Sequence, residues 1–90
     1  MADRFHLQVV VQDQSLFDGN VTSIIAPGEE GYLGVLAHHA PLLTTLGAGT
    51  LTVHSDPGIE VFHIRGGFLE VLNNEVTVLA DSVDETGAAA

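Results

Sequence analysis

Residues 68–80 read Phe-Leu-Glu-Val-Leu-Asn-Asn-Glu-Val-Thr-Val-Leu-Ala, and this stretch decides the fold. Two apolar-rich runs, Phe68–Leu72 and Glu75–Ala80, flank the pair Asn73-Asn74. Asparagine tolerates the left-handed backbone conformation that a two-residue hairpin turn requires. We therefore predict two antiparallel strands that are joined at Asn73-Asn74.

Short apolar runs separated by turn residues recur through the rest of the chain. The first run, Phe5–Val11, has an apolar residue at every odd position, which is the period of a strand with one buried face. Further strands are predicted at Val21–Ala26, Thr50–His54 and Ile59–Arg65. Proline cannot continue a ladder and glycine accepts a positive φ, so turns are predicted at Asp18-Gly19-Asn20, Pro27-Gly28 and Asp56-Pro57-Gly58.

This succession of strands and turns predicts an all-β fold, a small antiparallel β-sandwich (flattened barrel) of two sheets. The 90 residues suffice for one small domain, and no amphipathic stretch is long enough to form a packing helix. We expect the sandwich domain to span residues 1–81. Residues 82–90 are acidic and small, so we expect them to form a flexible tail.

The charge balance restricts the partners. Twelve carboxylates against Arg4 and Arg65 give a formal charge of −10. Nucleic acid and anionic lipid are poor partners for such a chain, because both are bound through clustered Lys and Arg. A basic protein surface is the better counterpart. Met1–His6 lacks the features of a signal peptide, and no apolar run reaches the roughly 18 residues of a membrane span. We expect neither export nor lipid insertion.

The sequence offers little for catalysis or metal binding. His38 and His39 are adjacent, and adjacent side chains on extended backbone point to opposite sides. His54 and His63 could approach across a hairpin, although half-exposed strand residues are the commoner case. The serines have no nucleophile-elbow sequence and the chain has no Cys. Gly66-Gly67 precedes a strand and lacks the lysine of a phosphate loop, so a bulge or a close backbone approach is expected there.

Three motifs carry a family resemblance that covers about Phe5 to Asp81. They are Gly31-Tyr32-Leu33-Gly34 followed by His39-Ala40-Pro41-Leu42-Leu43-Thr44, then Gly66-Gly67-Phe68-Leu69-Glu70-Val71, then Val76-Thr77-Val78-Leu79-Ala80-Asp81. In order and spacing they resemble the epsilon subunit of the rotary ATP synthase. Two departures lie on one loop: Ala37-His38 stands where relatives commonly have Pro-Gly, and Tyr32 stands where a carboxylate is frequent.

The resemblance implies a non-catalytic subunit of the central stalk, without a cofactor and monomeric when isolated. Such a chain binds the gamma subunit and the c-ring, is peripheral at the cytoplasmic face of the energy-coupling membrane, and couples proton or ion transport to ATP synthesis. Carried onto matching positions, Glu29, Glu30, Gly31 and Tyr32 face the c-ring. The positions toward gamma are His39, Leu42, Leu43 and Thr44, and we expect one of the two leucines in the core and the other under gamma.

Longer relatives carry a C-terminal helical hairpin that can inhibit ATP hydrolysis or bind ATP. We expect this chain, taken as the native short form, to lack both functions. A free-standing β-sandwich that binds a small ligand is the alternative function, and an enzyme that uses the histidines is a more distant one.

Overall fold

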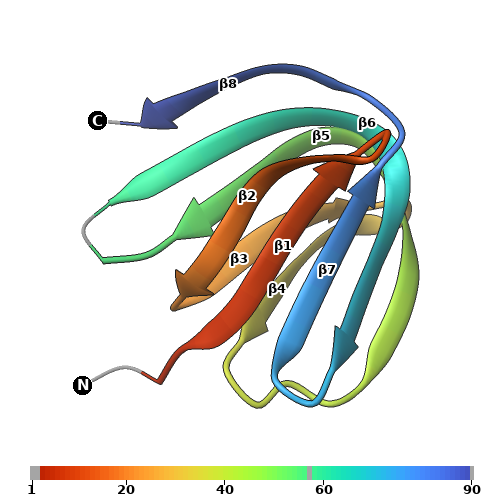
Figure 1. The fold of residues 1–90 in the computed structure, drawn as a ribbon. Helices are drawn as coiled ribbons and strands as arrows, with labels where there is room; N and C mark the ends of the chain where they lie inside the picture. Colours follow the sequence, from red (N-terminus) through yellow and green to blue (C-terminus); the bar gives the residue numbers. More distant parts are fainter. Residues whose placement is uncertain (1–2, 57, 90) are drawn as a thin grey trace.

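The computed structural model describes residues 3–56 and 58–89, and these residues form strands and turns without any helix. The all-β fold is thereby confirmed (Figure 1). The strands are β1 (Phe5–Val11), β2 (Gln14–Val21), β3 (Ser23–Gly28), β4 (Gly31–Leu36), β5 (Leu42–His54), β6 (Ile59–Leu72), β7 (Glu75–Ala80) and β8 (Val83–Ala89).

The period of two in the sequence becomes two faces in the structure. In β1, Phe5, Leu7 and Val9 are buried, whereas the residues between them are half-buried. The same alternation runs through β6 and β7, where the inward side chains of Leu69, Val71 and Val76 close the core. The core is apolar throughout the described residues: no polar or charged residue is buried in it. Burial of apolar surface is therefore the main source of stability.

The strands follow the order β2-β1-β7-β6-β5-β3-β4, with β8 also paired to β6. The two long strands β5 and β6 bend, so that this one hydrogen-bonded sheet folds over into the two layers of a sandwich (Figure 1). The first half of β6 pairs with β8 and its second half pairs with β7. The sandwich is not a closed barrel, because β2 and β4 end the strand order without pairing to each other. All strand pairs are antiparallel except β1–β7, which is parallel and departs from the predicted antiparallel pattern.

The bend in β6 occurs at Gly66-Gly67, where φ is +77° and +133°. A Cβ on Gly67 would lie 2.1 Å from the carbonyl oxygen of Leu79, which no side chain could occupy. These glycines therefore allow the close backbone approach that the sequence predicted, and they leave one strand where two had been expected.

The hairpin at Asn73-Asn74 is confirmed, and both asparagines have the left-handed conformation, with φ of +52° and +62°. The turn predicted at Asp18-Gly19-Asn20 is wrong: these residues lie inside β2 and pair with β1. The actual turn is Gln12-Asp13, where φ is +46° and +65°. The ladder with β1 outweighs the local turn preference of Asp, Gly and Asn.

Two other boundaries differ from the predicted ones. The predicted strand Val21–Ala26 is divided at Thr22, and the strand that follows, β3, continues through Pro27 to Gly28 before the chain turns. Residues Val83–Ala89 of the predicted tail form β8, because backbone pairing with β6 does not require apolar side chains. The flexibility of residues 82–90 in solution stays a prediction. Pro57, at the predicted reversal after β5, lies outside the described residues.

Candidate functional site

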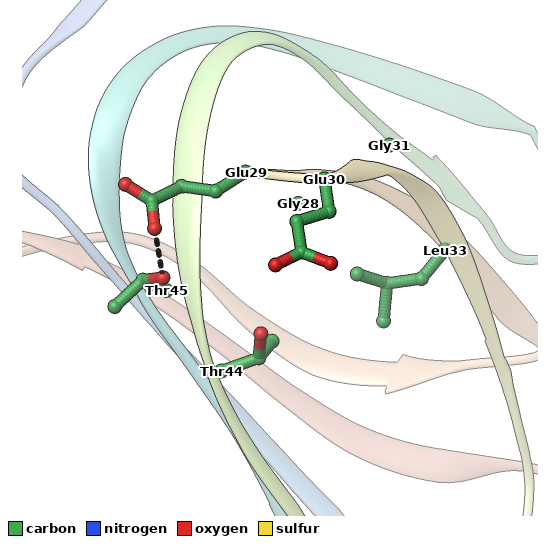
Figure 2. Close-up of a pocket in the computed structure, with 7 residues that line it drawn as sticks. All are labelled: Gly28, Glu29, Glu30, Gly31, Leu33, Thr44 and Thr45. Carbon is green, nitrogen blue, oxygen red and sulfur yellow. Dashed lines mark hydrogen bonds between the residues drawn. The ribbon is translucent and has the colours of Figure 1, made fainter.

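The predicted c-ring contact forms the tip of the β3–β4 hairpin. Gly28 pairs with Gly31, so Glu29 and Glu30 are the two turn residues and both are exposed. The Oε1 atom of Glu29 accepts a hydrogen bond from the Thr45 hydroxyl (Figure 2). The backbone N–H of Glu29 also donates to the Thr45 carbonyl at 3.3 Å. The hairpin tip is thus tied to β5, although the carboxylates remain accessible.

An open pocket of about 250 Å³ lies beneath this tip. Its remaining wall comes from Leu33, Thr44 and Thr45, and the Glu30 carboxylate points to the same side as Thr44 (Figure 2). Carboxylates accept hydrogen bonds and cannot donate them when ionised. The pocket therefore suits a cationic or hydrogen-bond-donating group. In residues 3–56 and 58–89, no three His, Asp or Glu residues are placed to hold a metal ion.

Tyr32 has a structural role that the sequence did not indicate. The residue is 60% exposed, yet its hydroxyl accepts a hydrogen bond from the Thr50 N–H at 3.0 Å. Ile25 of β3 pairs with Thr52 of β5, and the next pair is Gly28 with Leu46, so three residues of β3 span the same stretch as six of β5. Thr50 lies in this irregular part of β5. Tyr32 thus supplies an acceptor that the interrupted ladder lacks.

Gly49 makes room for the Tyr32 contact. A Cβ at Gly49 would lie 2.6 Å from the Tyr32 hydroxyl and 2.7 Å from the Pro27 side chain. Loss of the Tyr32 side chain would therefore also remove a hydrogen bond within the domain, and its contact with the c-ring stays a prediction.

The predicted gamma contact divides between two faces. Leu43 is 69% exposed and lies on the outer face of β5. Leu42 and Thr44 face the other way, since they pair with the buried residues Val71 and Leu69. Leu42 packs against the core, and Thr44 lines the pocket beneath the hairpin tip. The two leucines thus lie on opposite faces, and the half-buried Leu42 packs against the core. Their role toward gamma stays a prediction.

His39 lies in the loop between β4 and β5. Its N–H donates to the Leu36 carbonyl at 3.2 Å, and its Nδ1 atom lies 2.7 Å from the Ala40 carbonyl oxygen. The histidine therefore shapes the approach of the chain to β5.

Three exposed apolar residues beside Leu43 were missed by the sequence analysis. Phe68, Leu72 and Leu79 are 49%, 49% and 50% exposed. Phe68 on β6 pairs with Leu79 on β7. Leu43 on β5 pairs with Glu70, which lies on β6 between Phe68 and Leu72. We name Leu43, Phe68, Leu72 and Leu79 the outer apolar patch. The sequence contained evidence for this patch, because these apolar residues occupy the outward-facing alternate positions of their strands, which are normally polar.

A shallow groove of about 280 Å³ lies at the end of the outer apolar patch that holds Leu43 and Leu72. Leu42 and Val71 also line it, together with Pro41 and Glu70. Groups of exposed apolar side chains on a small domain typically mark a protein interface.

The structure does not bring His54 and His63 together across the β5–β6 hairpin. In the β5–β6 ladder His54 pairs with Ile59 and His63 pairs with Thr50, so the two histidines do not face each other. Both arginines form exposed ion pairs, Arg4 with Asp56 at 3.0 Å and Arg65 with Asp84 at 2.9 Å. The other carboxylates leave the surface acidic. In the described part of the chain no helix is long and apolar enough to cross a membrane.

Comparison with known proteins gives consistent matches. Residues 4–86 match the family "ATP synthase, Delta/Epsilon chain, beta-sandwich domain". The chain is 43% identical over 82 residues to the ATP synthase epsilon chain of Caulobacter vibrioides, covering 91% of this chain and 95% of that one. It is 38% identical over 80 residues to the epsilon chain of Leptospira interrogans, covering 89% of this chain and 63% of that one.

Two solved structures have the same fold. A chain of the Euglena gracilis mitochondrial ATP synthase, from the OSCP/F1/c-ring structure in rotational state 1, matches with a TM-score of 0.84 and 26% identity, covering 90% of this chain and 52% of that one. A chain from the central stalk/c-ring of the Tetrahymena thermophila mitochondrial enzyme matches with a TM-score of 0.78 and 15% identity, covering 93% of this chain and 68% of that one. The Tetrahymena likeness concerns the fold alone.

Proposed function

Because the chain belongs to the delta/epsilon-chain β-sandwich family of ATP synthases, we propose that it links the gamma subunit to the c-ring in the central stalk. In this role it couples the transport of protons or another ion to ATP synthesis without itself being catalytic. The observation that carries the proposal is the family match over residues 4–86, which includes both the hairpin tip and the outer apolar patch. The complex would hold the chain as a peripheral subunit at the cytoplasmic face of the membrane.

The proposed gamma contact is the outer apolar patch together with His39. Leu43 contributes the most exposed apolar side chain of the patch, and Phe68 and Leu79 extend the surface across two strands. Thr44 faces the pocket beneath the hairpin tip. Leu42 supports the contact from the core side, because it packs beneath the strand that carries Leu43. A partner that covers this patch removes apolar surface from water and gains affinity that salt barely changes.

The proposed c-ring contact is the hairpin tip, residues Glu29, Glu30, Gly31 and Tyr32. Its two exposed carboxylates complement a basic or polar loop, and the pocket below can accept one donor group from that loop. Exposed charge pairs of this kind contribute modestly to affinity and more to orientation and association rate. The two contacts would make gamma, this chain and the c-ring turn as one body.

Transmission of torque requires that the domain deform little under load. The long strands β5 and β6 each contribute to both layers, so that the layers share a continuous ladder of backbone hydrogen bonds. Such a ladder resists relative sliding of the layers better than loops would.

Co-purification tests the proposal. The 90-residue chain, tagged and mixed with gamma, should form a stoichiometric complex that persists at high salt. Absence of a complex with gamma at micromolar concentrations would contradict the proposal. The small-ligand alternative has less support, because the pocket and the groove described above are open and fall below the roughly 300 Å³ at which ligand sites begin.

We further propose that the 90-residue chain itself neither inhibits ATP hydrolysis nor binds ATP. The test is ATP hydrolysis by the catalytic head with and without added chain, together with titration of the chain by ATP. Strong inhibition that disappears when residues 82–90 are deleted, or saturable ATP binding, would contradict this.

A further inference from the structure

Asn74 joins three separate segments of the chain at the end of the sandwich where the β4–β5 loop lies. Its Oδ1 atom accepts a hydrogen bond from the His38 N–H at 2.7 Å. Its Nδ2 atom donates to the Arg4 carbonyl at 2.9 Å. Its own carbonyl accepts from the His6 N–H at 3.2 Å. One half-buried residue therefore connects the β6–β7 turn to the β4–β5 loop and to the start of β1.

The β4–β5 loop depends on this contact for its shape. His38 has a φ of +65°, a conformation that a non-glycine residue adopts at a cost in free energy. The hydrogen bond from its N–H to Asn74 compensates part of that cost, and it comes from a turn 36 residues away. The next residue, His39, closes the loop on Leu36, and β5 begins at Leu42. The direction in which the chain enters β5 is thus set at His38.

We infer that Asn74 is a positioning residue for the loop and strand start that present His39 and Leu43. The part of this inference that concerns gamma rests on the proposed function; the part that concerns the loop does not. Asn74 does not belong to the outer apolar patch, and we assign it no contact with gamma. It acts through His38.

Asparagine is suited to this position for two reasons. Its φ of +62° is one that asparagine tolerates well, and glycine is the other common choice. Its amide group also both accepts and donates, so it can bond His38 and Arg4 at the same time. Aspartate keeps the acceptor for His38 but loses the donor to Arg4. Glycine keeps the turn and loses both bonds.

The competing contact on this loop is weak. The Nε2 atom of His38 lies 3.4 Å from the Asp3 carboxylate, but these side chains are 68% and 73% exposed. Exposed pairs of this kind contribute little to stability. The bond to the Asn74 amide is shorter, at 2.7 Å, and it holds the backbone of His38 rather than its side chain.

Amide hydrogen exchange measured by NMR on the whole chain tests the inference. Asn74→Gly should raise the exchange rate of the His38 amide about tenfold relative to the core amides of β6, as expected for the loss of one hydrogen bond. Asn74→Asp should keep His38 protected. The matched control is Asn73→Gly, because Asn73 shares the left-handed turn while the hydrogen bonds of the described residues include none from its side chain. This variant should leave His38 unchanged.

Binding to gamma is the second readout. Asn74→Gly should weaken it about threefold or more while Asn73→Gly does not, as expected for a contact held in place by one hydrogen bond. An unchanged His38 exchange rate in Asn74→Gly would overturn the inference, and so would an equal rise at every amide, which would indicate loss of the hairpin. If wild-type chain fails to bind gamma at all, the proposed function fails, whereas the exchange experiment still decides the role of Asn74.

Discussion

The hairpin tip at Glu29–Tyr32 and the outer apolar patch present opposite chemistry on one small domain. The tip is charged, contains a hydrogen-bonding pocket and is tied to β5 by Thr45 and Thr50. The patch is a set of leucine and phenylalanine side chains on the outer face of β5, β6 and β7, each about half exposed or more. A charged tip favours orientation and reversible contact, whereas an apolar patch favours lasting attachment. Under the proposed function, we expect gamma to hold this domain firmly and the c-ring to align it.

Aspartate substitutions at the two adjacent leucines should give the largest difference. Leu43→Asp should weaken gamma binding by about a hundredfold, because it places a charge under an apolar contact. Its free energy of unfolding should fall by less than about 0.5 kcal/mol, since the side chain is exposed. Leu42→Asp should lower that free energy by about 2 kcal/mol or more, because Leu42 packs against the core. Chemical denaturation and a gamma binding assay measure both. Equal destabilisation by the two changes would show that the assignment of faces is wrong.

Removal of the Tyr32 hydroxyl should have a smaller effect. Tyr32→Phe keeps the ring but leaves the Thr50 N–H without its acceptor, so the free energy of unfolding should fall by about 1 kcal/mol. Tyr32→Ala should lower it further and should also weaken retention of the catalytic head on membranes. If Tyr32→Phe matches wild type in denaturation, the hydroxyl has no structural role. If Tyr32→Ala leaves retention unchanged, Tyr32 does not belong to the c-ring contact.

The carboxylates at the tip should give the smallest effect and the clearest dependence on salt. Glu29→Gln combined with Glu30→Gln should weaken c-ring binding about threefold to tenfold at low salt and much less at high salt, because exposed charges are screened within about 8 Å at physiological ionic strength. Gamma binding should be unaffected. A loss of c-ring binding that does not change with salt would argue against a charge contact.

The sequence predicted the parts of the fold that depend on local chemistry. Asn73-Asn74 formed the expected turn because both residues tolerate a positive φ. Gly66-Gly67 allowed the expected close approach of two strands. The core residues of β1 followed directly from the period of two.

Features that depend on distant pairing could not be predicted in this way. Tyr32 binds Thr50 only because β3 and β5 lose register, and a sequence does not show where a ladder is interrupted. Asp18, Gly19 and Asn20 have strong turn preferences that pairing with β1 overrides. The outer apolar patch, apart from Leu43, was missed for a different reason, since Phe68, Leu72 and Leu79 were taken as members of apolar-rich strands without regard to the face on which each side chain lies.

Parallel binding assays with two variants test the central claim most directly. The apparent affinity of the whole chain for purified gamma and for the isolated c-ring would be measured for wild type, for Leu43→Asp and for the Glu29→Gln, Glu30→Gln double variant. Our account predicts that Leu43→Asp binds gamma much more weakly and binds the c-ring with wild-type affinity. It predicts that the double variant binds the c-ring more weakly at low salt and binds gamma with wild-type affinity. If either variant weakened binding to gamma and to the c-ring equally, the two surfaces would not be separate contacts, and the account would be contradicted.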